Sequence, residues 1–156
     1  MNKSKIEIIP FSDEHKEAIK ILNYEWLEKY FRVEPGDRKS LSNPREQIIG
    51  KGGFIFYALL NGEIVGTASL LKKGESVFEL GKMAVSEKAR GYGIGTLLLE
   101  HCLEFAKQNE MESLILYSNA QLESAIHLYR KYGFHEIELE KGLYERADIK
   151  MEKRML

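Results

Sequence analysis

The chain has 156 residues, of which 44% are hydrophobic, and a formal net charge of -1 at pH 7. This length predicts a single domain over residues 1–156 with a substantial core. Its 23 basic residues are spread along the sequence and form no basic stripe, which argues against nucleic-acid binding. The only cysteine, Cys102, excludes an internal disulfide framework. Because no apolar segment has the length of a leader or a membrane span, we expect a cytoplasmic protein with no membrane contact.

The first third of the chain is predicted to form a strand, a helix and a stretch of turns. A strand over residues 5–11 is followed by polar residues 12–14, which can cap a helix that runs to about Phe31. Residues 32–44 contain a Pro-Gly pair and a second proline, so we expect turns there, with a short helix over 45–49.

Three strands with hairpin punctuation follow. They are expected over residues 54–60, 64–71 and 77–85. Asn61-Gly62 is the strongest short hairpin signal, and Lys73-Gly74 marks a second turn. The middle of the chain is therefore predicted to be an antiparallel meander.

From Gly93 onward the hydrophobic period becomes helical. Ile94, Leu97, Leu98, Cys102 and Phe105 are expected on the buried face of this helix. A buried strand over 113–118, a helix over 122–132 and strands over 135–140 and 147–151 follow. A meander joined to a strand, helix, strand crossover predicts an α/β (α+β) domain with a mixed sheet in three layers.

The segment from Arg90 to Thr96, read Arg-Gly-Tyr-Gly-Ile-Gly-Thr, joins a strand to this helix. Alternating glycines let backbone N–H groups approach an anion, and a helix N-terminus adds unpaired donors and positive potential. The spacing and the missing lysine exclude a Walker A loop. The third glycine falls one position early for a dinucleotide fingerprint. The segment predicts a phosphate site of another kind.

Two motifs in this order resemble those of the GNAT superfamily of acyl-coenzyme A dependent N-acetyltransferases. The first is Arg90-Gly91-Tyr92-Gly93-Ile94-Gly95, and the second runs from Ala125 to Phe134 with the pattern A-x-x-L-Y-x-x-x-G-F. The resemblance covers about residues 54–134. It implies a GNAT-like fold with a splayed acyl-coenzyme A cleft. It also implies direct transfer of an acetyl group from acetyl-coenzyme A to an amine of a small molecule or peptide.

The resemblance places the donor along the strand and the loop. The pyrophosphate is expected on the N–H groups of Gly91, Gly93, Ile94, Gly95 and Thr96, with Arg90 adding charge. The pantetheine arm is expected to pair with the main chain of Met83 and Val85, as though it were a further strand. Asn119 is a weaker candidate contact, because many relatives have an asparagine where this chain has Leu122.

Two side chains are the candidate catalytic groups. Tyr129 occupies the tyrosine position of the second motif and is expected to protonate the departing sulfur, although its helical spacing also fits a core tyrosine. Glu79 is the candidate base for the amine, directly or through water, although an exposed strand glutamate is the competing interpretation. Strand alternation puts Glu79 on the same face as Met83 and Val85, unless a bulge near Lys82 reverses the order.

The acceptor is left unnamed by the sequence. Its wall is expected from Trp26, Tyr30, Phe31 and Arg32 and from the last strands near Tyr144. The expected partners are acetyl-coenzyme A and an amine, and a homodimer is left open. The four histidines show no metal spacing, so no metal is predicted. Two alternatives remain: an acyl-coenzyme A binding regulator without turnover, and an unrelated α/β scaffold with a structural glycine loop.

Overall fold

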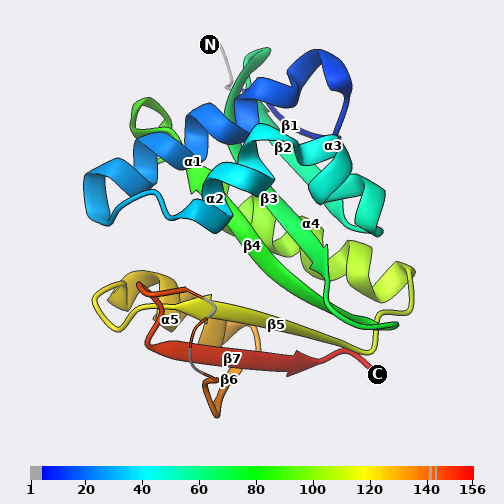
Figure 1. Cartoon of the computed structure of the whole chain (residues 1–156). Helices are drawn as coiled ribbons and strands as arrows, with labels where there is room; N and C mark the ends of the chain where they lie inside the picture. The colour runs from blue at the N-terminus through cyan, green and yellow to red at the C-terminus, as the bar shows by residue number, and fades with distance from the viewer. Residues whose placement is uncertain (1–4, 141, 143) are drawn as a thin grey trace.

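A computed structural model describes residues 5–140, 142 and 144–156 and shows a seven-stranded sheet with helices on both faces (Figure 1). The strands, in chain order, are β1 (Ile6–Pro10), β2 (Phe54–Leu60), β3 (Glu63–Lys72), β4 (Val77–Val85), β5 (Ser113–Ser118), β6 (His135–Ile137) and β7 (Ile149–Arg154). The helices are α1 (Lys16–Tyr30), α2 (Pro35–Ser42), α3 (Pro44–Gln47), α4 (Ile94–Gln108) and α5 (Glu123–Lys131), with single 3-10 turns at Asp13–His15, Ile49–Lys51 and Glu87–Ala89.

The sheet order is β1-β2-β3-β4-β5-β7-β6, and β4–β5 is its parallel pair, the others being antiparallel. This arrangement confirms the mixed sheet and the central meander. The β2–β3 turn has φ of 51° at Asn61 and 86° at Gly62, the left-handed pair that a type I′ hairpin requires. The second turn is closed by hydrogen bonds from the N–H groups of Lys73 and Gly74 to the carbonyl of Val77.

Two hydrophobic cores lie on the two faces of the sheet. The larger core packs α4 against β2, β3, β4 and β5, with Leu98 and Cys102 fully buried. The smaller core packs α1, α2 and the residues just after α3 on the opposite face around Ile19, Leu41 and Tyr57. Apolar surface is buried on both faces of the sheet, and each Å² buried contributes a stabilising free energy of about 25 cal/mol. This burial holds the sheet between its two helix layers.

The helix α2 lies where the sequence predicted turns, so that expectation was wrong. Pro35 occupies the first helical position, where its fixed φ and missing N–H cost nothing. A capping box then closes the N-terminus: Asp37 accepts a hydrogen bond from the N–H of Glu34, and the Glu34 carboxylate accepts one from the N–H of Asp37. The Pro-Gly signal therefore marks the beginning of a helix.

The last two strands and the buried face of α4 also differ from the sequence prediction. The strand expected over 135–140 ends at Ile137, and the last strand covers Ile149–Arg154 instead of 147–151. Leu97 is exposed, because Ile94, Leu98, Leu99, Cys102 and Ala106 make up the buried stripe of α4. This stripe is rotated by a fraction of a turn from the expected face.

Strand β4 contains a bulge and then parts from β5. Between Ser69 and Thr67 of β3 the opposing β4 residues are Gly81 and Ala84, so β4 carries one extra residue, and Lys82 has φ of 49°. Pairing with β5 covers only residues 77–79 of β4. Beyond them, no described strand pairs with this edge of β4, and the two ribbons diverge in Figure 1.

Four charged residues form an ion network between α2, the bulge and the C-terminal segment. Arg146 binds Asp37 through both terminal nitrogens, at 2.7 and 3.0 Å, and Glu34 at 2.7 Å. The Lys82 ammonium lies 3.0 Å from Asp37. The side chains of Asp37 and Lys82 are buried, and Arg146 is nearly so. The ion network therefore ties together three segments that are distant in sequence.

We expect Asp37→Asn to destabilise the protein by about 3 kcal/mol at pH 7, because Lys82 and Arg146 would lose their shared anion. Burial favours a higher pKa for Asp37, but the hydrogen bond from Arg146 and the charge of Lys82 outweigh it and hold the pKa at about 2. A pKa below that of the unfolded chain stabilises the fold above about pH 4, and this contribution is lost as the pH falls toward 2. Denaturant unfolding between pH 2 and 7 measures both effects.

Asp13→Asn is the matched control, since Asp13 pairs with Arg45 on the surface. Its unfolding midpoint should stay close to that of the wild type. Wild-type stability of Asp37→Asn at pH 7, or an unchanged acid dependence, would contradict a stabilising role for the ion network.

Candidate functional site

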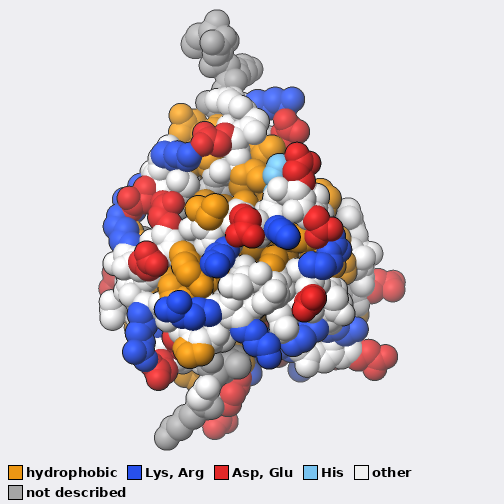
Figure 2. All heavy atoms as spheres, turned by 45° about the horizontal axis from the view of Figure 1, so that its top comes forward, with side chains coloured by type: hydrophobic (Ala, Val, Ile, Leu, Met, Phe, Trp, Pro, Cys, Tyr) orange, Lys and Arg blue, Asp and Glu red, His pale blue; other side chains and the backbone are white. Residues whose placement is uncertain are grey.

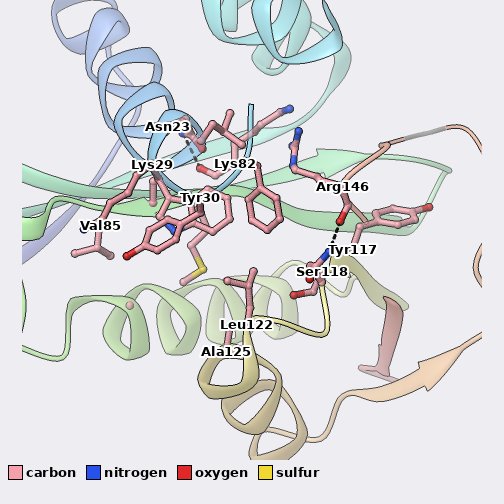
Figure 3. A pocket seen from close by; sticks show the side chains of 18 of the residues that line it. Asn23, Lys29, Tyr30, Lys82, Val85, Tyr117, Ser118, Leu122, Ala125 and Arg146 are labelled. Carbon is pink, nitrogen blue, oxygen red and sulfur yellow. Dashed lines mark hydrogen bonds between the residues drawn. The ribbon is translucent and has the colours of Figure 1, made fainter. Parts of the chain in front are cut away.

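A cavity of about 380 Å³ lies where β4 and β5 part (Figure 3). Its walls come from α1, β4, β5, α5 and the segment before β7. In Figure 3, Asn23 and Tyr30 extend from α1 toward the cavity, and Leu122 and Ala125 project from the side of α5. The cavity therefore joins the β4 edge to the start of α4 and to the C-terminal segment.

The N-terminus of α4 is open toward solvent. Gly91 and Gly93 have φ of 86° and 70°, which L side chains rarely adopt. A Cβ placed on Gly91, Gly93 or Gly95 would meet no atom within 4 Å. The first-turn N–H groups of α4 lack helical partners, and the helix dipole favours an anion there. These glycines leave open space at the helix N-terminus that a side chain would fill.

The structure gathers part of the expected donor site around the cavity. Met83, Val85, Arg90, Gly95 and Asn119 line it. The Arg90 guanidinium donates to the Tyr30 hydroxyl at 3.0 Å and pairs with Glu87 at 3.5 Å, so it is held near the cradle. The other expected donor contacts lie outside the cavity lining: Gly91, Gly93, Ile94 and Thr96.

The side chain of Ile94 is buried at 2% exposure, and that of Asn119 is already hydrogen-bonded. The Asn119 amide donates to the Arg146 carbonyl at 2.7 Å, and its oxygen accepts from the Gln121 N–H at 2.9 Å. Asn119 therefore holds the C-terminal segment beside the cavity. Leu122, which stands where relatives often have asparagine, presents an apolar side chain to the cavity.

Tyr129 lies on α5 and lines the cavity. Its ring packs edge-to-face against Phe134, with centroids 5.9 Å apart. Burial raises the pKa of the Tyr129 hydroxyl to about 12, so the group carries its proton at neutral pH. A protonated hydroxyl that borders the cavity can donate a proton there.

Glu79 is buried, at 3% exposure, and lines the same cavity. Its Oε2 accepts a hydrogen bond from the Tyr144 hydroxyl at 3.1 Å, and its Oε1 lies 3.2 Å from the Lys73 ammonium. The bulge reverses the alternation of β4, because Phe78 and Leu80 face the α4 core before it and Met83 and Val85 face that core after it. Glu79 therefore points to the α1 side.

The far end of the cavity is aromatic and charged. Trp26, Tyr30, Phe31 and Tyr144, four of the five residues expected in the acceptor wall, line it. The fifth, Arg32, is exposed and pairs with Glu145. The lining residues that sequence reasoning did not place at the site include Tyr117, Lys82 and Arg146.

Tyr117 packs against Tyr144 with ring centroids 5.6 Å apart, and Lys82 and Arg146 lie 5.3 and 4.8 Å from the Tyr144 ring centre. Burial, followed by the charge of Glu79, holds the pKa of Tyr144 far above its usual range. These residues come from three segments, so no local spacing could have predicted that they meet. The one sequence signal for this group was Lys82, a charged residue inside the predicted strand 77–85.

Cys102 is fully buried in the larger core, as expected, and burial raises its thiol pKa to about 12. Within residues 5–140, 142 and 144–156, no cluster of three or more His, Cys, Asp or Glu side chains is arranged to hold a metal ion. The helices in this part of the chain are all too short or too polar to cross a bilayer.

Comparison with known proteins agrees with this geometry. Residues 20–134 match the family model described as the acetyltransferase (GNAT) family. Streptothricin acetyltransferase A of Bacillus subtilis (strain 168) is 30% identical over 105 residues, which cover 67% of this chain and 58% of that protein. The match spans between 38% and 58% of the length of three curated relatives.

Solved structures share the fold over nearly the whole chain. A GNAT-family acetyltransferase from Staphylococcus aureus Mu50 superposes with a TM-score of 0.86, at 22% identity, covering 97% of this chain and 100% of that one. The PaiA N-acetyltransferase of Thermoplasma acidophilum, in complex with coenzyme A, gives 0.75 at 21% identity, covering 96% of this chain and 99% of that one. The chain belongs to the GNAT family of acetyltransferases.

Proposed function

We propose that this chain is a single-domain N-acetyltransferase, which transfers an acetyl group from acetyl-coenzyme A directly to an amine. One observation carries the proposal: a single cavity borders an open helix N-terminus, an unpaired strand edge and two buried groups able to transfer protons. Family membership indicates the class of reaction, and the geometry supports the roles proposed below for the residues around the cavity.

The donor would lie along β4 and the start of α4. The backbone N–H groups of Gly91, Gly93, Ile94, Gly95 and Thr96 would bind the pyrophosphate, with Arg90 adding positive charge beside them. The β4 edge that faces away from β3 would pair with the amides of the pantetheine arm through Met83 and Val85. Asn119 would contribute by holding the neighbouring segment in place.

The bulge gives the β4 backbone a role in the acetyl transfer. Lys82 adopts a left-handed conformation, and the β3–β4 ladder is interrupted there before it resumes at Ala84 and Val85. An N–H near Val85 would then stabilise the negative charge that develops on the acetyl oxygen. The Asn23 side chain donates to the Lys82 carbonyl at 3.1 Å and so helps to fix this backbone.

Tyr129 and Glu79 would move the protons. An alkylamine with a pKa of about 10.4 is almost wholly protonated at pH 7, and freeing its lone pair costs roughly 4 to 5 kcal/mol. Glu79 would accept that proton, directly or through water, held in place by Tyr144 and Lys73. Tyr129 would give its proton to the departing sulfur. The two groups approach from opposite faces of the sheet.

Acetyl-coenzyme A binding tests the cradle, and thiol release tests the reaction. Calorimetry should show binding, and a panel of amino acids, polyamines, aminoglycosides and peptide N-termini should include an acceptor that releases free thiol. Gly95→Leu should lower affinity for acetyl-coenzyme A by roughly tenfold or more, because a side chain there fills the open space before α4. Gly95 has ordinary helical φ, so this variant should fold.

Gly36→Leu is the matched control for donor affinity, since Gly36 is also the second residue of a helix and also faces open space. Its affinity for acetyl-coenzyme A should equal that of the wild type. Binding without thiol release for any amine would favour a regulator, and no binding at all would favour an unrelated scaffold.

Tyr129→Phe should lower turnover by about 100-fold while leaving the affinity for acetyl-coenzyme A nearly unchanged. With its pKa at about 12, Tyr129 keeps its proton up to about pH 11. Deprotonation of Tyr129 should therefore cause no loss of wild-type turnover at any pH lower than about 11. Tyr132→Phe is the control, because its hydroxyl bonds to Glu100 away from the cavity. Full turnover in Tyr129→Phe would exclude the acid role.

Glu79→Gln should lower kcat/KM by about 100-fold for an alkylamine at pH 7. The deficit should shrink at higher pH, where more of the amine is already free of its proton. Steady-state kinetics between pH 7 and 10 measure this trend, with exposed Glu75→Gln as the control. A deficit that stays constant across this range would assign Glu79 a purely structural role.

A further inference from the structure

A second cavity, of about 330 Å³, lies beside the first on the α2 side of the sheet. It is formed by α2, α3, the turn after α3 and the β3–β4 hairpin. Tyr144 and Lys82 line both cavities, so the two meet at these side chains. The family motifs assign no role to this second cavity, which we call the lysine groove.

The lysine groove is lined by five lysines and by no acidic residue: Lys39, Lys51, Lys72, Lys73 and Lys82. Two of these charges are balanced, because Lys82 pairs with Asp37 at 3.0 Å and Lys73 with Glu79 at 3.2 Å. Lys39, Lys51 and Lys72 have no acidic partner within 4 Å among the described residues. The groove therefore carries an excess of three positive charges.

On another part of the surface, side chains of both charges lie side by side. Figure 2 shows acidic and basic side chains interspersed over most of the face that carries α1 and α2, with a group of basic side chains low in the view. Lys5, Lys29, Lys88 and Lys150 each have a carboxylate partner. Three lysines without a carboxylate partner among the described residues concentrate positive charge around one hollow. Their mutual repulsion would be relieved by an anion bound between them.

The groove also reaches the proposed catalytic base. Lys73, which lines the groove, contacts Oε1 of Glu79, and Tyr144, which lines both cavities, contacts Oε2. A molecule with one end in the groove could therefore place its other end beside Tyr144 and Glu79. Gln47 and Ser40 add neutral polar groups to the wall.

We infer that the acceptor is an amine with an anionic group, and that Lys39, Lys51 and Lys72 bind this group while the amine faces Glu79. The inference rests on the proposed acetyl transfer. Exposed ammonium groups recognise carboxylate and phosphate alike as point charges, so either anion satisfies the groove. In the transfer, the nitrogen forms a bond to the acetyl carbon, the carbon–sulfur bond breaks, and the amine proton passes to Glu79.

Matched pairs of acceptors test the preference. β-Alanine against propylamine tests a carboxylate, and phosphoethanolamine against ethanolamine tests a phosphate. We expect kcat/KM to be at least about tenfold higher for the anionic member of one pair, mainly through KM. Raising the ionic strength should reduce this preference, since salt screens exposed charges. Equal rates for both members of both pairs would overturn the inference.

The combined variant Lys39→Gln, Lys51→Gln, Lys72→Gln should abolish the preference, because kcat/KM for the anionic acceptor should fall to that of its neutral partner. A control of equal charge change is Lys5→Gln, Lys16→Gln, Lys107→Gln, whose sites are exposed and lie outside both cavities. This control should keep the preference for the anionic acceptor. If the groove variant still prefers the anionic acceptor, the anionic group must bind in another part of the cleft.

Binding without turnover separates this inference from the proposed function. Calorimetry with phosphoethanolamine and β-alanine, on protein saturated with coenzyme A, should show binding of one of them in the wild type and the control. In the groove variant the affinity should fall by about tenfold or more. If binding behaves in this way and no thiol is released, the groove is an anion-binding site but the proposed acetyl transfer is wrong. Wild-type affinity in the groove variant would overturn the groove whether or not turnover occurs.

Discussion

The shared carboxylate of Asp37 is the interaction on which the shape of the cleft depends. It accepts hydrogen bonds from Arg146 and Lys82, so that one anion joins α2, the β4 bulge and the C-terminal segment. A cleft between two parting strands cannot use a strand ladder across the gap. In an ordinary core, buried ion pairs can often be replaced by apolar side chains. Here they hold three segments together at the point where regular strand pairing stops.

The left-handed conformation of Lys82 has consequences on both faces of the sheet. The extra residue in β4 sends Glu79 toward α1 and α2, while Met83 and Val85 face α4. Beyond residue 79, β5 no longer pairs with β4, so the main-chain groups on that edge have no strand partner among the described residues. In the proposed function, Glu79 acts on the amine and this edge binds the donor. Asn23 and Asp37 hold the two ends of Lys82, its carbonyl and its ammonium.

The sequence predicted the parts of the molecule that depend on local pattern. The β2–β3 hairpin followed from Asn61-Gly62, and the helix α4 from the glycine segment before it, because both depend on backbone conformations that few residues adopt. The helix α2 was missed because its capping box uses Glu34 where serine or threonine is usual, and because Pro35-Gly36 also suits a turn. The bulge near Lys82 was anticipated as an alternative. Whether Glu79 shares a face of the sheet with Met83 and Val85 depends on how β4 pairs with β3, which local sequence does not show.

The donor and acceptor ends of the cleft differ in how much local sequence encodes them. The donor end uses backbone groups of one strand–loop–helix segment, so glycine spacing reveals it. The acceptor end is built from Glu79, Lys82, Tyr117, Tyr144 and Arg146, together with the lysine groove, and these side chains meet only in the folded chain. A Cβ on Gly91, Gly93 or Gly95 would meet no atom within 4 Å, so no side chain of the acceptor end packs against the donor cradle. If the proposed roles hold, a scaffold divided in this way keeps one acyl donor while the charge of the lysine groove selects the amine.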